Sequence, residues 1–177
     1  VQTLLPYCRF VEQEEEYSIS LSEDELEDEL SDVKPGVRQL SIQRAGPREK
    51  LYFDPSKTRC AIVTCGGLCP GINDVIRSIV LEAHYNYGVS SILGIRFGLQ
   101  GFVPSYGHDL VELTPDEVSN IHQFGGTVLG SSRGPQSVEE IVDSLERMNV
   151  SVLFAIGGDG TIKGANMINK EITKRKL

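Results

Sequence analysis

The sequence has no apolar run that approaches the roughly 18 residues needed to cross a membrane, and no charged segment followed by an apolar one opens the chain. It also lacks the arginine and aromatic alternation of nucleic-acid-binding surfaces. We therefore expect neither a membrane nor a nucleic acid as partner.

The three histidines show no metal-ligand spacing, and the four cysteines lack the CxxC pairs of a zinc site. We expect the cysteines to be reduced intracellular thiols: Cys8, Cys60, Cys65 and Cys69.

Basic charge is nearly absent from the start of the chain. Residues 1–32 carry 11 of the 25 acidic residues but only one basic residue, Arg9, whereas the rest has 16 basic and 14 acidic residues. The net charge of -8 thus comes from the first segment. A near-neutral body is compatible with a local site for an anionic metabolite.

The composition divides the chain into two parts. Residues 1–58 are acidic at first and then interrupted by Pro and Gly, which predicts an extended N-terminal arm. Residues 59–177 alternate apolar runs with helical patterns, which predicts the first part of a globular domain. Because the chain starts at Val1 rather than Met, and a helical pattern runs to Leu177 with no stop signal, we expect it to be part of a longer protein.

The second part predicts an α/β fold. Apolar runs predict strands over 60–64, 91–97, 109–113 and 150–156, and apolar spacing predicts helices over 73–87, 114–123, 137–148 and 161–175. Asn73 is expected to cap the first helix, and Gly88 to end it. Strands that alternate with long helices indicate a doubly wound, mainly parallel, Rossmann-like sheet with helices on both faces. We expect this fold to be incomplete and to carry the arm as an extension.

The first candidate site is the glycine-rich loop 66–73, between the first strand and its helix. Glycines allow positive φ and a close approach of backbone N–H groups to an anion, and the helix N-terminus adds a favourable dipole. This position suits a phosphate. The alternative is a tight turn with no ligand.

The second candidate is the loop 156–161, which also joins a strand to a helix. Ligands of doubly wound sheets bind at the carboxyl ends of the strands, so this loop and the first can face one crevice. Asp159 supplies a hard oxygen ligand for Mg²⁺, and Thr161 can cap its helix or touch a phosphate. The alternative is a turn in which Asp159 only caps the helix.

The third candidate is the stretch 125–134, which is too rich in glycine for a regular element and carries Arg133. A guanidinium offers a fixed fork of donors that suits phosphate and can counter the charge on a transferring phosphoryl group. The alternative is an ordinary surface arginine.

Together and in order, these stretches resemble the phosphofructokinase family from about residue 47 to the end. The resemblance is carried by residues 64–77, 94–102, 125–134 and 156–165, and the loop Gly-Gly-Leu-Cys-Pro-Gly-Ile-Asn with the arm ending at 45–48 resembles the plant-type ATP-dependent branch. It implies a glycolytic kinase, ATP-dependent 6-phosphofructokinase, which forms fructose 1,6-bisphosphate from fructose 6-phosphate with ATP and Mg²⁺. It also implies a homo-oligomer when complete, in the cytoplasm or alternatively in a plastid.

The resemblance further implies roles for single residues. Arg133 would stabilise transition-state charge, and Asp159 would serve Mg²⁺. The implied nucleotide site comprises Gly67, Arg133, Gly134, Gly158, Asp159, Gly160 and Thr161. The family places its catalytic base in a Thr-Ile-Asp-Asn-Asp motif that does not occur in this sequence. We therefore expect the isolated chain to be inactive.

The phosphoryl donor is implied by one residue. Pyrophosphate-dependent members that resemble this chain carry Asp after the loop aspartate, whereas this chain carries Gly160, which implies ATP. A pyrophosphate-dependent enzyme and a non-catalytic regulatory or binding subunit are the alternatives. NAD kinases and diacylglycerol-type lipid kinases share the Gly-Gly-Asp-Gly-Thr loop but lack the upstream loop.

Overall fold

The computed structural model describes residues 10, 11, 16–19 and 40–177. The chain divides into two units, Val1–Tyr52 and Phe53–Leu177. In the first unit, β1 (Glu16–Ile19) pairs antiparallel with β2 (Leu40–Gln43). The acidic stretch 22–30 lies outside the described residues. The expected arm over 1–58 and the nucleotide-binding role of 59–177 stay predictions.

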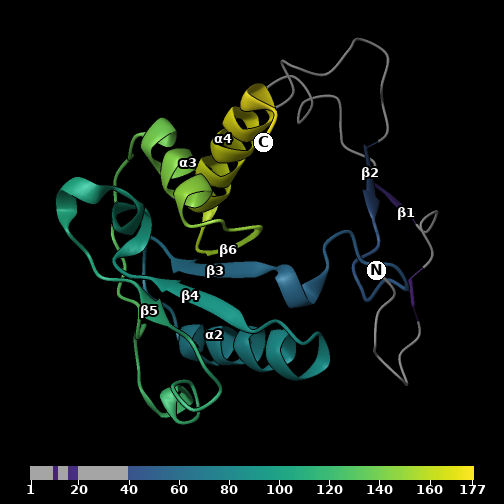
Figure 1. Ribbon diagram of the computed structural model, residues 1–177, viewed down its shortest axis with the longest axis horizontal. Helices are drawn as coiled ribbons and strands as arrows, with labels where there is room; N and C mark the ends of the chain where they lie inside the picture. Colours follow the sequence, from purple (N-terminus) through teal and green to yellow (C-terminus); the bar gives the residue numbers. More distant parts are fainter. Residues whose placement is uncertain (1–9, 12–15, 20–39) are drawn as a thin grey trace. The chain divides into compact units, whose positions relative to one another are not determined.

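The second unit is built on a four-stranded sheet with the order β5-β4-β3-β6. The central strand β3 (Arg59–Thr64) is parallel to β4 (Ser91–Ile95) and to β6 (Val152–Ile156). Only β5 (Val111–Glu112) runs antiparallel, against β4, among the described strands of this sheet. Because the later strands lie on both sides of β3, the sheet is doubly wound and mainly parallel, as predicted (Figure 1).

Helices cover both faces of this sheet, as predicted (Figure 1). Successive side chains of β3 point to opposite faces, and its residues 60–63 are at most 3% exposed. One face forms a core with α2 (Ile72–Leu81) and the other with α3 (Val138–Arg147) and α4 (Asp159–Arg175). Burial on both faces explains why β3 reads as a continuous apolar run.

The start of α2 differs from the prediction. Its N-cap is Gly71, in the left-handed region at φ 89°, and no side chain caps the helix. Asn73 lies inside the helix and is 2% exposed, so its expected capping role is wrong. The helix continues into a π-helical turn, η2 (Glu82–Asn86), and Gly88 follows at φ 73°, which confirms the predicted stop.

Helices α3 and α4, on the face of the sheet opposite α2, match the predicted segments more closely. Ser137 caps α3, because its hydroxyl accepts a hydrogen bond from the Glu140 amide at 3.3 Å. Helix α4 begins at Asp159, two residues before the predicted start. The remaining short helices are 3-10 turns: η1 (Pro55–Lys57), η3 (Gly98–Phe102), η4 (Pro104–Tyr106) and η5 (Ile121–Gln123). In the part of the chain that is described, no helix has the length and apolar character needed to cross a membrane.

The α-helix expected over 114–123 is wrong. Residues 115–120 form turns, and η5 follows. Local side-chain bonds compete with the helix here: the Thr114 hydroxyl accepts from the Glu117 amide, and the Ser119 hydroxyl donates to the Asp116 carbonyl. Val118 and Ile121 are nevertheless buried in the core, which explains their apolar spacing.

Candidate functional site

The carboxyl ends of β3 and β6 bring two of the three predicted loops together. Thr64 and Ile156 are register partners at the last position of each strand. One residue further, the Cys65 amide donates to the Ile156 carbonyl at 2.8 Å. The loop after β3 and the loop before α4 therefore leave the sheet side by side, as expected for a doubly wound sheet.

The third loop is joined to the first by two hydrogen bonds around Gly66. The Gly66 amide donates to the Ser132 carbonyl at 3.1 Å, and the Ser131 hydroxyl donates to the Gly66 carbonyl at 2.7 Å. These bonds place the backbone beside Arg133 next to the loop after β3. The three glycine-rich loops found in the sequence thus meet at one edge of the sheet.

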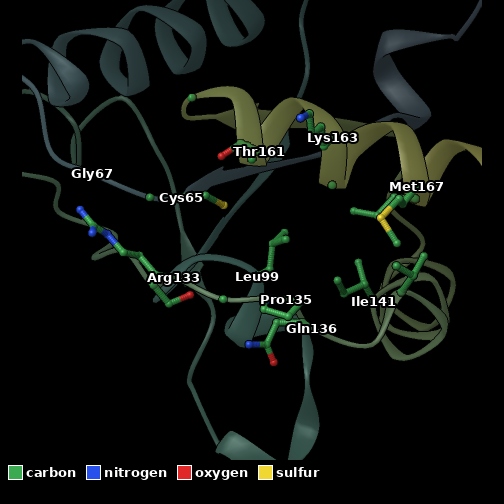
Figure 2. A pocket seen from close by; sticks show the side chains of 18 residues that line it. Cys65, Gly67, Leu99, Arg133, Pro135, Gln136, Ile141, Thr161, Lys163 and Met167 are labelled. Carbon is green, nitrogen blue, oxygen red and sulfur yellow. The ribbon is translucent and has the colours of Figure 1, made fainter. Parts of the chain in front are cut away.

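A cavity of about 550 Å³ lies where the loops meet. Figure 2 shows Gly67 and Arg133 at one end and Ile141 and Met167 at the other, with Thr161 above. Six of the predicted site residues line it: Gly67, Arg133, Gly134, Gly158, Gly160 and Thr161. The cavity therefore has a polar end formed by loops and an apolar end formed largely by helices α3 and α4.

Asp159 is the one predicted site residue that does not line this cavity. It is exposed and is the first residue of α4, between two lining glycines. In the described part of the chain, no three His, Cys, Asp or Glu side chains gather as a metal site would require. A cation at this place would have Asp159, the acidic residue of the first turn of α4, beside it.

The N-terminus of α4 faces the polar end of the cavity. Its N-cap, Gly158, provides no side chain, and the Gly158 carbonyl accepts from the amides of Thr161 and Ile162 at 2.9 and 3.1 Å. The first-turn amides and the helix dipole make such an end favourable for an anion. Position 157 requires glycine because the Thr161 side chain and the Cys65 carbonyl lie close to its backbone. A Cβ there would collide with the Thr161 side chain and lie 2.7 Å from the Cys65 carbonyl.

Arg133 lies at the boundary of two hollows. It is exposed, and it lines both the first cavity and a second one of about 480 Å³. The second hollow is lined mainly by the third loop together with Gly66 and Leu68. A guanidinium between two hollows can contact anionic groups in both.

Sequence reasoning missed several lining residues. Lys163 adds a second cation, and its signal was its spacing, because it lies three residues after the lining residue Gly160 on the same helix. The apolar lining had no comparable signal: Leu99, Pro135, Ile141, Met167 and Ile168 come from segments far apart in sequence.

The cysteine at the cavity is a buried free thiol. Cys65 lines the cavity and is 8% exposed, and its burial raises the pKa of the thiol. Hydrogen bonds from the Leu99 backbone and the Thr161 hydroxyl act in the opposite direction on that pKa. Cys60 and Cys69 are also free, while Cys8 lies outside the described residues. A raised pKa leaves little thiolate, so this geometry does not make Cys65 a nucleophile.

Comparisons with known proteins show what this chain is similar to. The sequence matches the family model described as Phosphofructokinase over residues 59–176. It is 56% identical over 136 residues to an ATP-dependent 6-phosphofructokinase of Borreliella burgdorferi, covering 77% of this chain and 30% of that protein. It is 54% identical over 138 residues to the chloroplastic ATP-dependent 6-phosphofructokinase 5 of Arabidopsis thaliana, covering 77% and 25%.

A solved structure shows the same fold. Phosphofructokinase of Pichia pastoris in the T state matches with a TM-score of 0.57 and 30% identity, over 64% of this chain and 12% of that chain. The matched part of the chain thus spans 30%, 25% and 12% of the length of these three proteins.

Proposed function

Because the chain belongs to the phosphofructokinase family, we propose that the protein containing it transfers the γ-phosphoryl group of ATP to the C1 hydroxyl of fructose 6-phosphate. The product would be fructose 1,6-bisphosphate, formed in a step of glycolysis, and the relatives' names, ATP-dependent 6-phosphofructokinase, support this proposal. The observation that supports this most is the meeting of three glycine-rich loops at one cavity. We also propose, on the resemblance alone, that the complete protein is a homo-oligomer of the cytoplasm or a plastid.

The polar end of the cavity is proposed to hold the phosphates of ATP. Gly67 and the N-terminus of α4 at Gly158 and Gly160 offer backbone to the anion, and Thr161 adds a hydroxyl. The apolar end, at Ile141 and Met167, is proposed to take the adenine ring. The cavity is large enough for a ligand of this size.

Arg133 is proposed to stabilise the charge that develops on the transferring phosphoryl group. Its position between two hollows supports this role, because donor and acceptor would then lie on either side of one guanidinium. The transition state spreads charge over the phosphoryl oxygens, and fixed donors counter that charge without reorganisation. Arg133 would act by charge and orientation, and Gly134 would continue the nucleotide site.

The residues fit a magnesium ion that is bound largely by phosphate oxygens and water. Mg²⁺ is commonly held by one or two carboxylates together with substrate phosphates, and Asp159 is a single exposed carboxylate beside the proposed phosphate site. When bound, the ion would offset phosphate charge. Asp159 would hold it at the N-terminus of α4, directly or through water.

The proton acceptor for the sugar hydroxyl is proposed to lie in another part of the whole protein, because the family's motif is not in this sequence.

ATP is proposed as the phosphoryl donor because Gly160 lines the cavity and a Cβ there would meet no atom within 4 Å. That open space can receive a phosphate. A pyrophosphate-dependent enzyme would instead be expected to carry a carboxylate at this position.

The test uses the full-length protein with MgATP and fructose 6-phosphate. Phosphorus NMR should show ADP and fructose 1,6-bisphosphate forming in equal amounts, and glucose 6-phosphate should not replace the substrate. Absence of the bisphosphate, with ATP bound, would favour a non-catalytic subunit.

A further inference from the structure

The loop that carries Arg133 is held by buried polar side chains from other elements. The Asn73 side chain of α2 donates to the Phe124 carbonyl and accepts from the Val128 amide, each at 2.9 Å. Thr64, the last residue of β3, is 1% exposed and contacts the same loop further along. The loop is thus attached at its start by Asn73 and near Arg133 by Thr64.

The hydrogen bonds at Thr64 form a chain with one direction. The Thr64 hydroxyl donates to the Gly130 carbonyl at 2.6 Å, which uses its only proton. The Thr127 hydroxyl lies 2.9 Å from the Thr64 oxygen, so Thr127 must be the donor of that pair. The Leu129 amide in turn donates to Thr127 at 3.2 Å. Two polar groups of the loop therefore bond directly to one hydroxyl of the strand, and the Leu129 amide is linked to it through Thr127.

The backbone at Gly130 packs closely against Phe97. Gly130 has φ 69°, and a Cβ there would lie 2.9 Å from the Phe97 ring. The Phe97 amide also donates to the Leu129 carbonyl at 2.8 Å. Gly130 is three residues before Arg133, and the next two residues hold Gly66. A shift of the Gly130 carbonyl would thus move the segment that places Arg133.

We propose that Thr64 is a positioning residue: its hydroxyl, at the carboxyl end of β3, fixes the loop that presents Arg133 to the two hollows. The expected effect of Thr64 on the catalytic rate rests on the proposed function, whereas its expected effect on the loop does not. Gly130 and Thr127 are half-buried, and without the hydroxyl of the buried Thr64 the Gly130 carbonyl and the Thr127 hydroxyl lose a shared partner. The loop would relax to recover hydrogen bonds.

The test compares three variants of the full-length protein. Thr64→Val removes the hydroxyl but keeps the side-chain shape, and Thr64→Ser keeps the hydroxyl. Thr58→Val is the matched control, because the Thr58 hydroxyl is also buried and donates to a carbonyl, that of Asp54 at 2.7 Å, but at the other end of β3. Misplacement of a catalytic group by about 1 Å can cost ~100-fold in rate. We expect kcat to fall about 10- to 100-fold in Thr64→Val, with KM for ATP little changed, and to recover in Thr64→Ser.

Hydrogen exchange of the same variants tests the loop itself, without any substrate. Amides over 127–132 should exchange at least about 10-fold faster in Thr64→Val than in Thr58→Val or Thr64→Ser. Unchanged exchange there would overturn the proposal. A kcat loss in Thr64→Val no larger than in Thr58→Val would overturn it too. Altered exchange in a protein that lacks kinase activity would instead refute the proposed function and leave the loop assignment supported.

Discussion

Replacing Gly160 with aspartate would add a carboxylate to the wall of the cavity proposed for ATP. A Cβ at Gly160 meets no atom within 4 Å, so the new side chain has room and the main effect should be electrostatic. Two unit charges about 4 Å apart repel by ~4 kcal/mol at an effective dielectric of about 20. Because the site opens to solvent, solvent screens part of this repulsion. We expect at least ~2 kcal/mol of it to weaken transition-state binding, which is about a 30-fold loss of kcat/KM for ATP.

Steady-state kinetics of the full-length Gly160→Asp variant would measure this loss, and Gly160→Asn is the matched neutral control. Asparagine has nearly the same size without the charge, so it should cost much less. The melting temperature should not fall, because an acidic residue in the first turn of α4 is favourable to the helix dipole. An asparagine variant as impaired as the aspartate variant, or an aspartate variant with normal kcat/KM for ATP, would refute the electrostatic reasoning.

Three further predictions concern charged residues of α4 and the third loop. Arg133→Ala should lower kcat about 100-fold or more with little change in melting temperature, since the side chain is exposed; a normal rate would return Arg133 to the status of a surface residue. Asp159→Asn should lower activity at least about 100-fold, and a near-normal rate at saturating Mg²⁺ would contradict its proposed role. A hydrogen bond from Arg175 lowers the pKa of Glu171, so this carboxylate should stabilise the fold above about pH 4.3 and lose that effect as pH falls through its lowered pKa. Calorimetry should therefore find Glu171→Gln less stable than the natural protein at pH 7 and equal to it in acid; an equal difference at both pH values would refute this.

Much of the fold could be predicted from the sequence because its signals are local. The buried strand β3 is a continuous apolar run, and Gly88 ends its helical segment through a positive φ that glycine readily adopts. Neighbouring parallel strands then bring the loops after β3 and β6 to one edge. The convergence of two predicted loops follows from these features alone.

The errors arise where tertiary contacts override local preference. Asn73 has the chemistry of an N-cap, but its amide instead serves the backbone of residues 124 and 128, which no local pattern reveals. The turns after Thr114 keep apolar residues at a spacing of three, which suits both a 3-10 turn and an α-helix. The apolar end of the cavity likewise depends on how α3 and α4 pack.

The claim at the centre of this account is that the cavity serves ATP-dependent phosphorylation of fructose 6-phosphate. Steady-state formation of fructose 1,6-bisphosphate by the full-length protein, with MgATP and with magnesium pyrophosphate in parallel, tests it most directly. We expect a higher kcat/KM with ATP. Faster turnover with pyrophosphate, or no bisphosphate with either donor, would contradict the account.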